Sequence, residues 1–291
     1  MKKLFALVMA AAMMVTLLAA CGNTTSNTGN SGNTTNNSTA NNSGDTSTGD
    51  TGDGSLNLVE DGKLIMATNA QFPPYEMVAD GDGYEGTGFE GIDVELAYAI
   101  AQKLGLELQI DDMEFDSALL AVQNNAADVV LAGLSYREDR DEVLDFTEKY
   151  ATGVQVVIVK SGSDVTMDNL GDGKLIGTQR GTTGYQYASD TPENGGYGED
   201  AVTAYDNGAT AIQALLNGQV DAVIIDQAPA EEYVAANEGL EILPGNWVEE
   251  DYCIAVDEGN TALLDAVQNA LSELQADGTV DAIIAKYIKA D

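Results

Sequence analysis

Two similar segments of the sequence each end in residues that could contact a bound ligand. Residues 118–133 and 211–226 align without gaps, and each has the pattern of an apolar helix, a short polar turn, an aspartate and a buried strand. In open α/β sheets, ligands bind beyond the carboxyl ends of the strands. Those ends carry Gly133 and Ser135 in one unit and Asp226 in the other. If the two units face each other, a ligand would lie between them. The alternative is that helix–Asp–strand units recur by chance in α/β proteins.

The residue types that are scarce exclude most kinds of catalysis. The sequence contains no histidine, which removes Ser-His-Asp and Cys-His catalysis and all histidine-ligated metal sites. Its two cysteines, Cys21 and Cys253, can form neither a disulfide framework nor a cysteine cluster for zinc or iron–sulfur. The net charge is −36, and phosphate backbones and anionic membrane surfaces repel so acidic a chain. We therefore expect no cofactor, no metal ion and no nucleic acid partner.

Two other features resemble functional sites but favour a structural role. The segment 80–86 is similar to a calcium-binding loop, but it lacks the third Asp or Asn and the final glutamate of that motif. We interpret it as the tip of a hairpin. Cys253 lies in the apolar stretch 252–256, which predicts a strand with a buried, inert thiol.

The N-terminal segment is typical of export. Two lysines precede an apolar stretch, residues 4–18, that is too short for a membrane span of about 20 residues. Residues 18–21 resemble the lipobox of bacterial lipoproteins, which implies a signal peptide at 1–20 and lipid attached to Cys21. The alternative is an ordinary signal peptide with a chance cysteine. The following residues to 57 are mostly Asn, Thr, Ser, Gly and Asp, which predicts a disordered linker.

The remaining chain alternates between strand and helix patterns. With 291 residues in all, the chain is long enough for two ordinary domains. Apolar residues recur with helical spacing from 92 to 104, and short apolar runs on either side predict strands. The sequence predicts strands at 63–68, 106–110, 128–131 and 154–159, and helices at 92–104 and 117–124. This alternation predicts an α/β architecture with largely parallel sheets.

Several motifs, in order along the chain, resemble one protein family. The segment Gly91-Ile-Asp-Val-Glu-Leu-Ala-Tyr-Ala-Ile-Ala-Gln-Lys-Leu104 fits the Gly-aromatic/aliphatic-acid-aliphatic-acid-aliphatic pattern of the bacterial extracellular solute-binding proteins of family 3. These are amino-acid receptors of ABC importers. The resemblance extends from about residue 63 to residue 288, and further matching motifs lie at 67–76, 113–116, 132–140, 144–147 and 181–183.

The resemblance implies a two-lobed, periplasmic-binding-protein-like fold of type II with a two-strand hinge. Lobe 1 would comprise residues 58–150 and 255–291, and lobe 2 residues 155–249, with hinge strands near 150–154 and 250–254. It also implies a monomeric receptor, not an enzyme, that captures a free L-amino acid between the lobes and delivers it to an ABC permease. The receptor would be extracytoplasmic and attached to the cell membrane only through its lipid.

The resemblance assigns the carboxylate of the amino acid to Arg140. A planar guanidinium suits such a group because it can donate two hydrogen bonds to one carboxylate. Backbone N–H groups at Thr182 and Thr183, where a helix opens, would add further donors. The alternative for Arg140 is a surface arginine that pairs with acidic residues beside it in the sequence.

The resemblance assigns the ammonium group to Asp226, assisted by the carbonyl of Gly133 and the hydroxyl of Ser135. Asp226 could instead cap the helix that starts near Pro229. Phe72 and Phe115 would enclose the ligand side chain, although either aromatic ring could simply belong to the core.

Two polar residues bear on which amino acid is bound. Asn69 occupies a position that is often aspartate in family members, including receptors for cationic amino acids, so the neutral amide weakens the case for a cationic ligand. Gln179 is a second polar contact. We favour a polar uncharged amino acid.

Two other functions remain compatible with the sequence. Periplasmic cyclohexadienyl dehydratases and some lytic transglycosylases resemble this family, and a carboxylate such as Asp226 or Glu76 could act there as an acid or base. A sensory or adhesive lipoprotein with the same fold is the other alternative.

Overall fold

The computed structural model describes residues 55–288 as a mixed α/β protein. Residues 1–54 and 289–291 lie outside the described part, and with them the expected signal peptide, Cys21 and most of the expected linker. Within 55–288, no helix has both the length and the apolar character that crossing a membrane requires.

The first of two large sheets has the strand order β5-β1-β6-β14-β7. Its strands are β1 (Lys63–Thr68), β5 (Glu107–Asp112), β6 (Val129–Val130), β7 (Leu144–Phe146) and β14 (Ala255–Asp257). β5 and β6 are parallel to β1, but β14 pairs antiparallel with β6 and β7. The expectation of a largely parallel sheet is therefore only partly met, because β14 joins this sheet after a return from the second sheet and not through a helical crossover.

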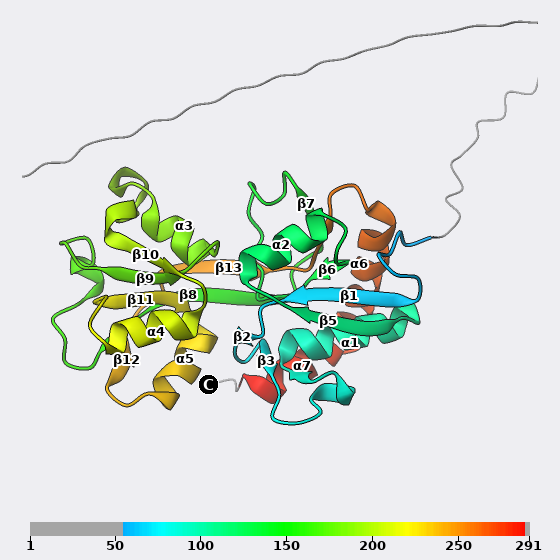
Figure 1. The fold of residues 1–291 in the computed structure, drawn as a ribbon, viewed down its shortest axis with the longest axis horizontal. Coiled ribbons are helices and arrows are strands. Elements are labelled where there is room, and N and C mark those ends of the chain that lie inside the picture. The colour runs from blue at the N-terminus through cyan, green and yellow to red at the C-terminus, as the bar shows by residue number, and fades with distance from the viewer. Residues whose placement is uncertain (1–54, 289–291) are drawn as a thin grey trace, which may run out of the picture. The chain divides into compact units, whose positions relative to one another are not determined.

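Alternate side chains of β1 face two separate cores, as the two-residue period of a strand requires. Leu64 and Met66 pack towards α1, α6 and α7, whereas Ile65 and Ala67 pack towards α2. These helices are α1 (Ile92–Leu104), α2 (Phe115–Gln123), α6 (Thr261–Ala276) and α7 (Thr279–Tyr287). Figure 1 shows α1 and α7 on one side of β1 and α2 on the other. We call this sheet with its helices the first lobe.

The second large sheet has the order β10-β9-β11-β8-β12, and β13 also pairs with β8. Its strands are β8 (Ala151–Lys160), β9 (Ile176–Gln179), β10 (Val202–Tyr205), β11 (Ala222–Asp226), β12 (Leu240–Ile242) and β13 (Val248–Tyr252). β9, β10 and β11 are parallel, whereas β12, β13 and β11 run antiparallel to β8. Its helices are α3 (Thr183–Ser189), α4 (Gly208–Leu216) and α5 (Gln227–Ala236). We call this sheet with its helices the second lobe.

A small third sheet lies between β1 and α1 in the sequence. It consists of β2 (Gln71–Phe72), β3 (Glu76–Val78) and β4 (Phe89–Glu90), paired antiparallel. The loop between β3 and β4 contains residues 80–86, so the expected hairpin is confirmed. Four 3₁₀ turns complete the described elements: η1 (Tyr84–Gly86), η2 (Met167–Asn169), η3 (Pro192–Asn194) and η4 (Glu199–Ala201).

Two antiparallel strands carry the chain between the lobes. β8 leaves the first lobe after β7, and β13 returns to it before β14, with Ala151 opposite Tyr252 (Figure 1). At Gly153, a Cβ atom would overlap the ring of Tyr252, so only glycine allows this ring to lie against the strand. Cys253 follows β13 and does not lie in a strand, because its N–H leaves the pair and bonds to the Leu134 carbonyl. Its thiol is buried, and burial raises the pKa of that thiol to about 11, as suits an inert cysteine.

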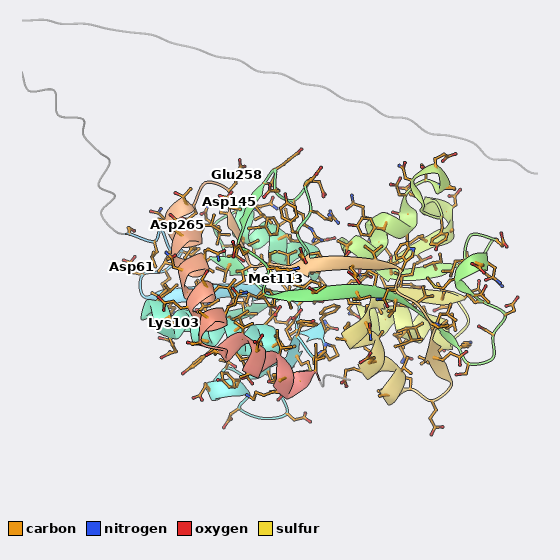
Figure 2. All side chains as sticks on the ribbon, turned by 180° about the vertical axis from the view of Figure 1, so that it is seen from behind. Asp61, Lys103, Met113, Asp145, Glu258 and Asp265 are labelled. Atoms are coloured by element: carbon orange, nitrogen blue, oxygen red, sulfur yellow. The ribbon has the colours of Figure 1, made fainter. Side chains whose placement is uncertain are left out.

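Much of the acidic charge of the protein lies at the surface. Asp61, Glu258 and Asp265 are exposed residues of the first lobe (Figure 2). Lys103 pairs with Glu273 of α6 at 3.0 Å, and its side chain is only partly exposed. The charge of these exposed acids therefore does not indicate the charge of the buried residues.

Candidate functional site

One cavity is lined by residues of both lobes. It contains every ligand-binding residue that the sequence analysis predicts, together with Glu76 and Ala132. The lining residues are Asn69, Phe72, Glu76, Phe115, Ala132, Gly133, Ser135, Arg140, Gln179, Thr182, Thr183 and Asp226.

The topology explains why residues so distant in sequence meet here. Asn69 directly follows β1, and Ser135 lies in the loop after β6. Gln179 and Asp226 are the last residues of β9 and β11. All four therefore lie at the carboxyl ends of parallel strands, the edge at which open α/β sheets bind ligands.

Arg140 is a buried cation without a carboxylate partner. It is 5% exposed, and its guanidinium donates to the carbonyl of Ser135 at 2.6 Å and to the carbonyl of Gly181 at 3.0 Å. Arg140 forms no ion pair with any carboxylate of the described residues. The neighbouring arginine, Arg137, is the one that pairs with Asp139. Burial lowers the pKa of the guanidinium to about 9. The alternative of a surface arginine is therefore wrong.

Asp226 is a buried acid without a basic partner. It stands at the N-cap position of α5, but its side chain makes no capping hydrogen bond and instead accepts one from the hydroxyl of Tyr252. Burial, and then the charge of Glu250, raise the pKa of its carboxyl to about 7. The capping alternative is therefore not what holds this side chain in place.

Two further buried acids lie in the first lobe. Glu76 is fully buried, and neither of its carboxyl oxygens accepts a hydrogen bond from a described donor. Asp93 beside it accepts from the N–H of Gly133 at 2.8 Å and from the hydroxyl of Tyr150 at 2.7 Å. Burial, and then the charge of Asp93, raise the pKa of Glu76 well above its usual range, and burial raises that of Asp93 to about 6.

Another buried carboxylate lies behind the cavity wall. Glu250, in β13, is 7% exposed and does not line the cavity. One of its oxygens, Oε2, accepts hydrogen bonds from Ser135 Oγ at 2.8 Å, from Thr183 Oγ1 at 2.9 Å and from Gln155 Nε2 at 3.1 Å. Ser135 belongs to the first lobe and Thr183 to the second, so this one oxygen joins both lobes to the returning strand.

The two predicted amide contacts bond to each other across the cavity. Gln179 donates from Nε2 to Asn69 Oδ1 at 3.0 Å, and Asn69 donates to the carbonyl of Met113 at 2.8 Å. Thr182 caps α3, accepting from the N–H of Tyr185 at 3.3 Å. Each amide is thereby held in one orientation.

The two aromatic residues belong to the core and also line the cavity. Phe72 and Phe115 are 7% and 6% exposed and lie in two different apolar clusters. The guanidinium carbon of Arg140 lies 5.4 Å from the centre of the Phe115 ring. Arg140 therefore lies against an aromatic face, where a cation is favoured.

The sequence analysis named Glu76 only as an acid or base of the alternative enzyme, and it did not identify Asp93 or Glu250. Glu76 could also have been assigned to the ligand site, because it ends the motif at 67–76 and pairs with Phe72 of the neighbouring strand. Asp93 and Glu250 act from behind the wall, and no pattern in the sequence places a residue of α1 or β13 there.

Comparison with known proteins agrees with this architecture. The family model for bacterial extracellular solute-binding proteins, family 3, matches residues 64–290. The arginine-binding extracellular protein ArtP of Bacillus subtilis is 30% identical over 77% of this chain and 86% of its own length. The L-cystine-binding protein TcyJ of Escherichia coli is 31% identical over 82% and 88%.

A solved structure gives the same result for the fold. An ancestral arginine-binding protein bound to arginine superposes with a TM-score of 0.70 at 37% identity, covering 78% of this chain and 98% of that protein. The expected two-lobed, periplasmic-binding-protein-like fold is therefore confirmed. With its mixed sheets, its crossing strands and its match over nearly the whole described chain, the protein belongs to the bacterial extracellular solute-binding proteins of family 3.

Proposed function

We propose that this protein is an extracytoplasmic receptor that captures a free L-amino acid between its lobes and delivers it to the permease of an ABC importer. One observation carries the proposal. A buried guanidinium without a carboxylate partner, Arg140, and a buried carboxyl without a basic partner, Asp226, line the same cavity. An isolated buried charge is costly, so this pair suits a ligand that brings one charge of each sign.

A free amino acid has this charge pattern at its backbone end. Its carboxylate would accept the hydrogen bonds that the guanidinium of Arg140 does not give to carbonyls, since a guanidinium has five N–H donors. The backbone N–H groups of Thr182 and Thr183 would be further donors to this carboxylate. Its ammonium would lie against Asp226, near the carbonyl of Gly133.

The rest of the cavity favours a ligand whose side chain ends in hydrogen-bond donors. Phe72 and Phe115 would enclose its apolar part. Asn69 and Gln179 offer amide groups, and Glu76 offers two carboxyl oxygens that no described donor uses. The amides favour a polar uncharged side chain such as that of L-glutamine. The Glu76 carboxyl extends the proposal to L-arginine, and two of the similar proteins are arginine-binding by name.

Ligand capture would act through closure of the lobes. In this proposal residues 58–150 with 255–291 move against residues 155–249, about β8 and β13. A ligand shifts such an equilibrium only through its higher affinity for the closed state. Contacts to Arg140 from one lobe and to Asp226 from the other provide that difference.

A thermal-shift screen tests the receptor proposal. Residues 22–291 would be unfolded, freed of bound ligand, refolded and screened against the twenty L-amino acids with ornithine, citrulline and cystine. An amino acid at about 100 times its Kd should add about 2.7 kcal/mol to the free energy of unfolding. Recovery of the ligand unchanged would support binding over catalysis. No shift with any of these compounds would contradict the proposal.

Delivery to a permease and attachment to the membrane need cellular tests. Deletion of the gene should abolish uptake of the labelled amino acid, whereas unchanged uptake with altered gene expression would indicate a sensor. Cys21→Ala should move the protein from the membrane fraction to the soluble fraction outside the cytoplasm, because a lipid on Cys21 is its only proposed anchor. A variant that stays in the membrane fraction would contradict the lipid anchor.

A further inference from the structure

Glu250 holds two hydroxyl groups of the cavity wall from behind. Ser135 Oγ and Thr183 Oγ1 both donate to the same carboxylate oxygen, at 2.8 Å and 2.9 Å. A hydroxyl has one hydrogen and two acceptor lone pairs. Once its hydrogen points at Glu250, each hydroxyl can offer the cavity only acceptor lone pairs.

The surroundings of Glu250 keep this arrangement in one orientation. Gln155 donates to the same oxygen at 3.1 Å, so Oε2 receives three donors. No basic side chain in the described chain forms an ion pair with Glu250, and its other oxygen, Oε1, is buried without a partner. The hydroxyls are therefore the groups that compensate the buried carboxylate, and turning either hydrogen away would leave that carboxylate less satisfied.

This orientation divides the cavity into an acceptor side and a donor side. Ser135, Thr183 and Asp226 all present acceptors, and an ammonium group has three N–H donors to give. The donors of Arg140 are left for a carboxylate. The positions of these groups therefore fix which end of an amino acid faces which lobe residue.

We propose that Glu250 is a positioning residue that turns the Ser135 and Thr183 hydroxyls into acceptors for the ammonium group of the captured amino acid. The inference rests on the proposed receptor function. Because one hydroxyl comes from each lobe, Glu250 completes this acceptor set only when the lobes are closed. It thereby links recognition of the ammonium group to closure.

The test compares an amino acid with its analogue that lacks the ammonium. Binding of L-arginine and of its 2-hydroxy analogue would be measured by calorimetry and competition, for the wild type and for Glu250→Met. L-Glutamine and its 2-hydroxy analogue would replace this pair if the wild type prefers L-glutamine. Glu250→Met replaces the carboxylate with a thioether, which is only a weak acceptor, so both hydroxyls lose their common acceptor and are free to turn their hydrogens into the cavity. We expect affinity for the amino acid to fall about tenfold or more, and affinity for the hydroxy acid to change less than about threefold.

A matched control and a double-mutant cycle separate positioning from charge. Glu249→Met removes the same charge from the adjacent, exposed position of β13 and should leave both affinities unchanged. Thr183→Val removes one hydroxyl at constant shape. If Glu250 acts through that hydroxyl, Glu250→Met should weaken binding less in the Thr183→Val background than in the wild type. Strictly additive losses would show a long-range charge effect and overturn the proposal.

The remaining outcomes also decide the question. Equal losses for the amino acid and the hydroxy acid would overturn the positioning role while leaving the receptor function intact. Failure of the wild type to bind any amino acid would overturn the receptor function, and this inference with it. If Glu250→Met does not fold, Ser135→Ala and Thr183→Val alone should still weaken binding of the amino acid more than binding of the hydroxy acid, and the opposite preference would refute the acceptor role.

Discussion

The guanidinium of Arg140 donates a 3.0 Å hydrogen bond to the carbonyl oxygen of Gly181, and this bond joins the two lobes. Arg140 follows β6 of the first lobe, and Gly181 precedes α3 of the second. A second donor of the same group bonds the carbonyl of Ser135 at 2.6 Å. One buried side chain therefore contacts the second lobe and is also the proposed partner of the ligand carboxylate.

Removing this side chain should weaken ligand binding strongly. Arg140→Ala leaves the ligand carboxylate buried without a cation, so we expect the binding free energy to weaken by about 3–5 kcal/mol. Calorimetry with the amino acid found in the screen would measure the loss. Arg137→Ala is the control, because that guanidinium pairs with the exposed Asp139. Its removal should change the binding free energy by less than about 1 kcal/mol. Near-native affinity in a folded Arg140→Ala protein would refute the site assignment.

Asp226 should contribute to ligand affinity but little to the stability of the ligand-free protein. Its carboxyl makes no cap to α5, and its raised pKa indicates that the ionised form is disfavoured by the fold. Asp226→Asn should therefore weaken amino-acid binding by about 1.5–3 kcal/mol, the worth of a charged hydrogen bond. The melting temperature without ligand should be unchanged or higher. A large decrease in that temperature would instead support a structural role for the carboxylate.

The stability of the ligand-free protein should fall as pH rises. The pKa values of Asp93 and Asp226 are raised to about 6 and about 7, above the value of about 3.9 for an unfolded aspartate. Between these values the folded state binds more protons than the unfolded state, so the free energy of unfolding decreases with pH. Urea unfolding should give a decrease on the order of 2–4 kcal/mol from pH 5 to pH 8.

Asp226→Asn provides the comparison for this pH dependence. Repulsion among the surface acids affects the wild type and the variant alike. The difference between their slopes of unfolding free energy against pH therefore reports on Asp226. We expect the variant to have the shallower slope. Equal slopes would mean that Asp226 is ionised in the fold over the whole range.

Ligand binding near neutral pH should release a proton. The ammonium of the amino acid favours the ionised form of Asp226, whose pKa in the ligand-free protein is about 7. At pH 6.5, as set for the experiment, about half a proton or more should leave per ligand bound. Calorimetry in two buffers of different ionisation enthalpy measures this number. Release that persists in Asp226→Asn would assign the proton to another acid, of which Glu76 is the nearest candidate in the cavity wall.

Gly133 should not tolerate a side chain. Its φ is +52°, and a Cβ atom would lie 2.6 Å from Cε1 of Phe72. Gly133→Ala should destabilise the protein by about 1–3 kcal/mol and weaken ligand binding, because the Phe72 ring must move in the cavity wall. Gly86→Ala is the matched control, with φ +83° and no atom within 4 Å of the added Cβ. It should cost stability through backbone strain alone, with binding unchanged. Equal binding losses in both variants would contradict the role of Phe72.

Local patterns were enough to locate several of the regular elements. β1 and α1 have the bounds that the sequence predicts, because a strand of alternating contacts and a helix between Gly91 and Gly105 depend mainly on nearby residues. β6 is only two residues long, and the aspartate before it, Asp128, uses its side chain to accept from the N–H of Ile65 at 2.7 Å. Such a short strand depends on its neighbours in the sheet, so its length could not be read from the sequence.

By itself, the sequence determined the absence of histidine chemistry, the α/β elements and, through its motifs, the residues that line the cavity. These features depend on residue types and on spacing along the chain. Only the tertiary structure decided that Arg140 and Asp226 are buried without ion-pair partners, and that Glu250 holds the Ser135 and Thr183 hydroxyls from behind. The reason is physical: desolvation and hydrogen-bond direction are set by atoms that surround a group in space, and here those atoms come from both lobes and from the strand between them.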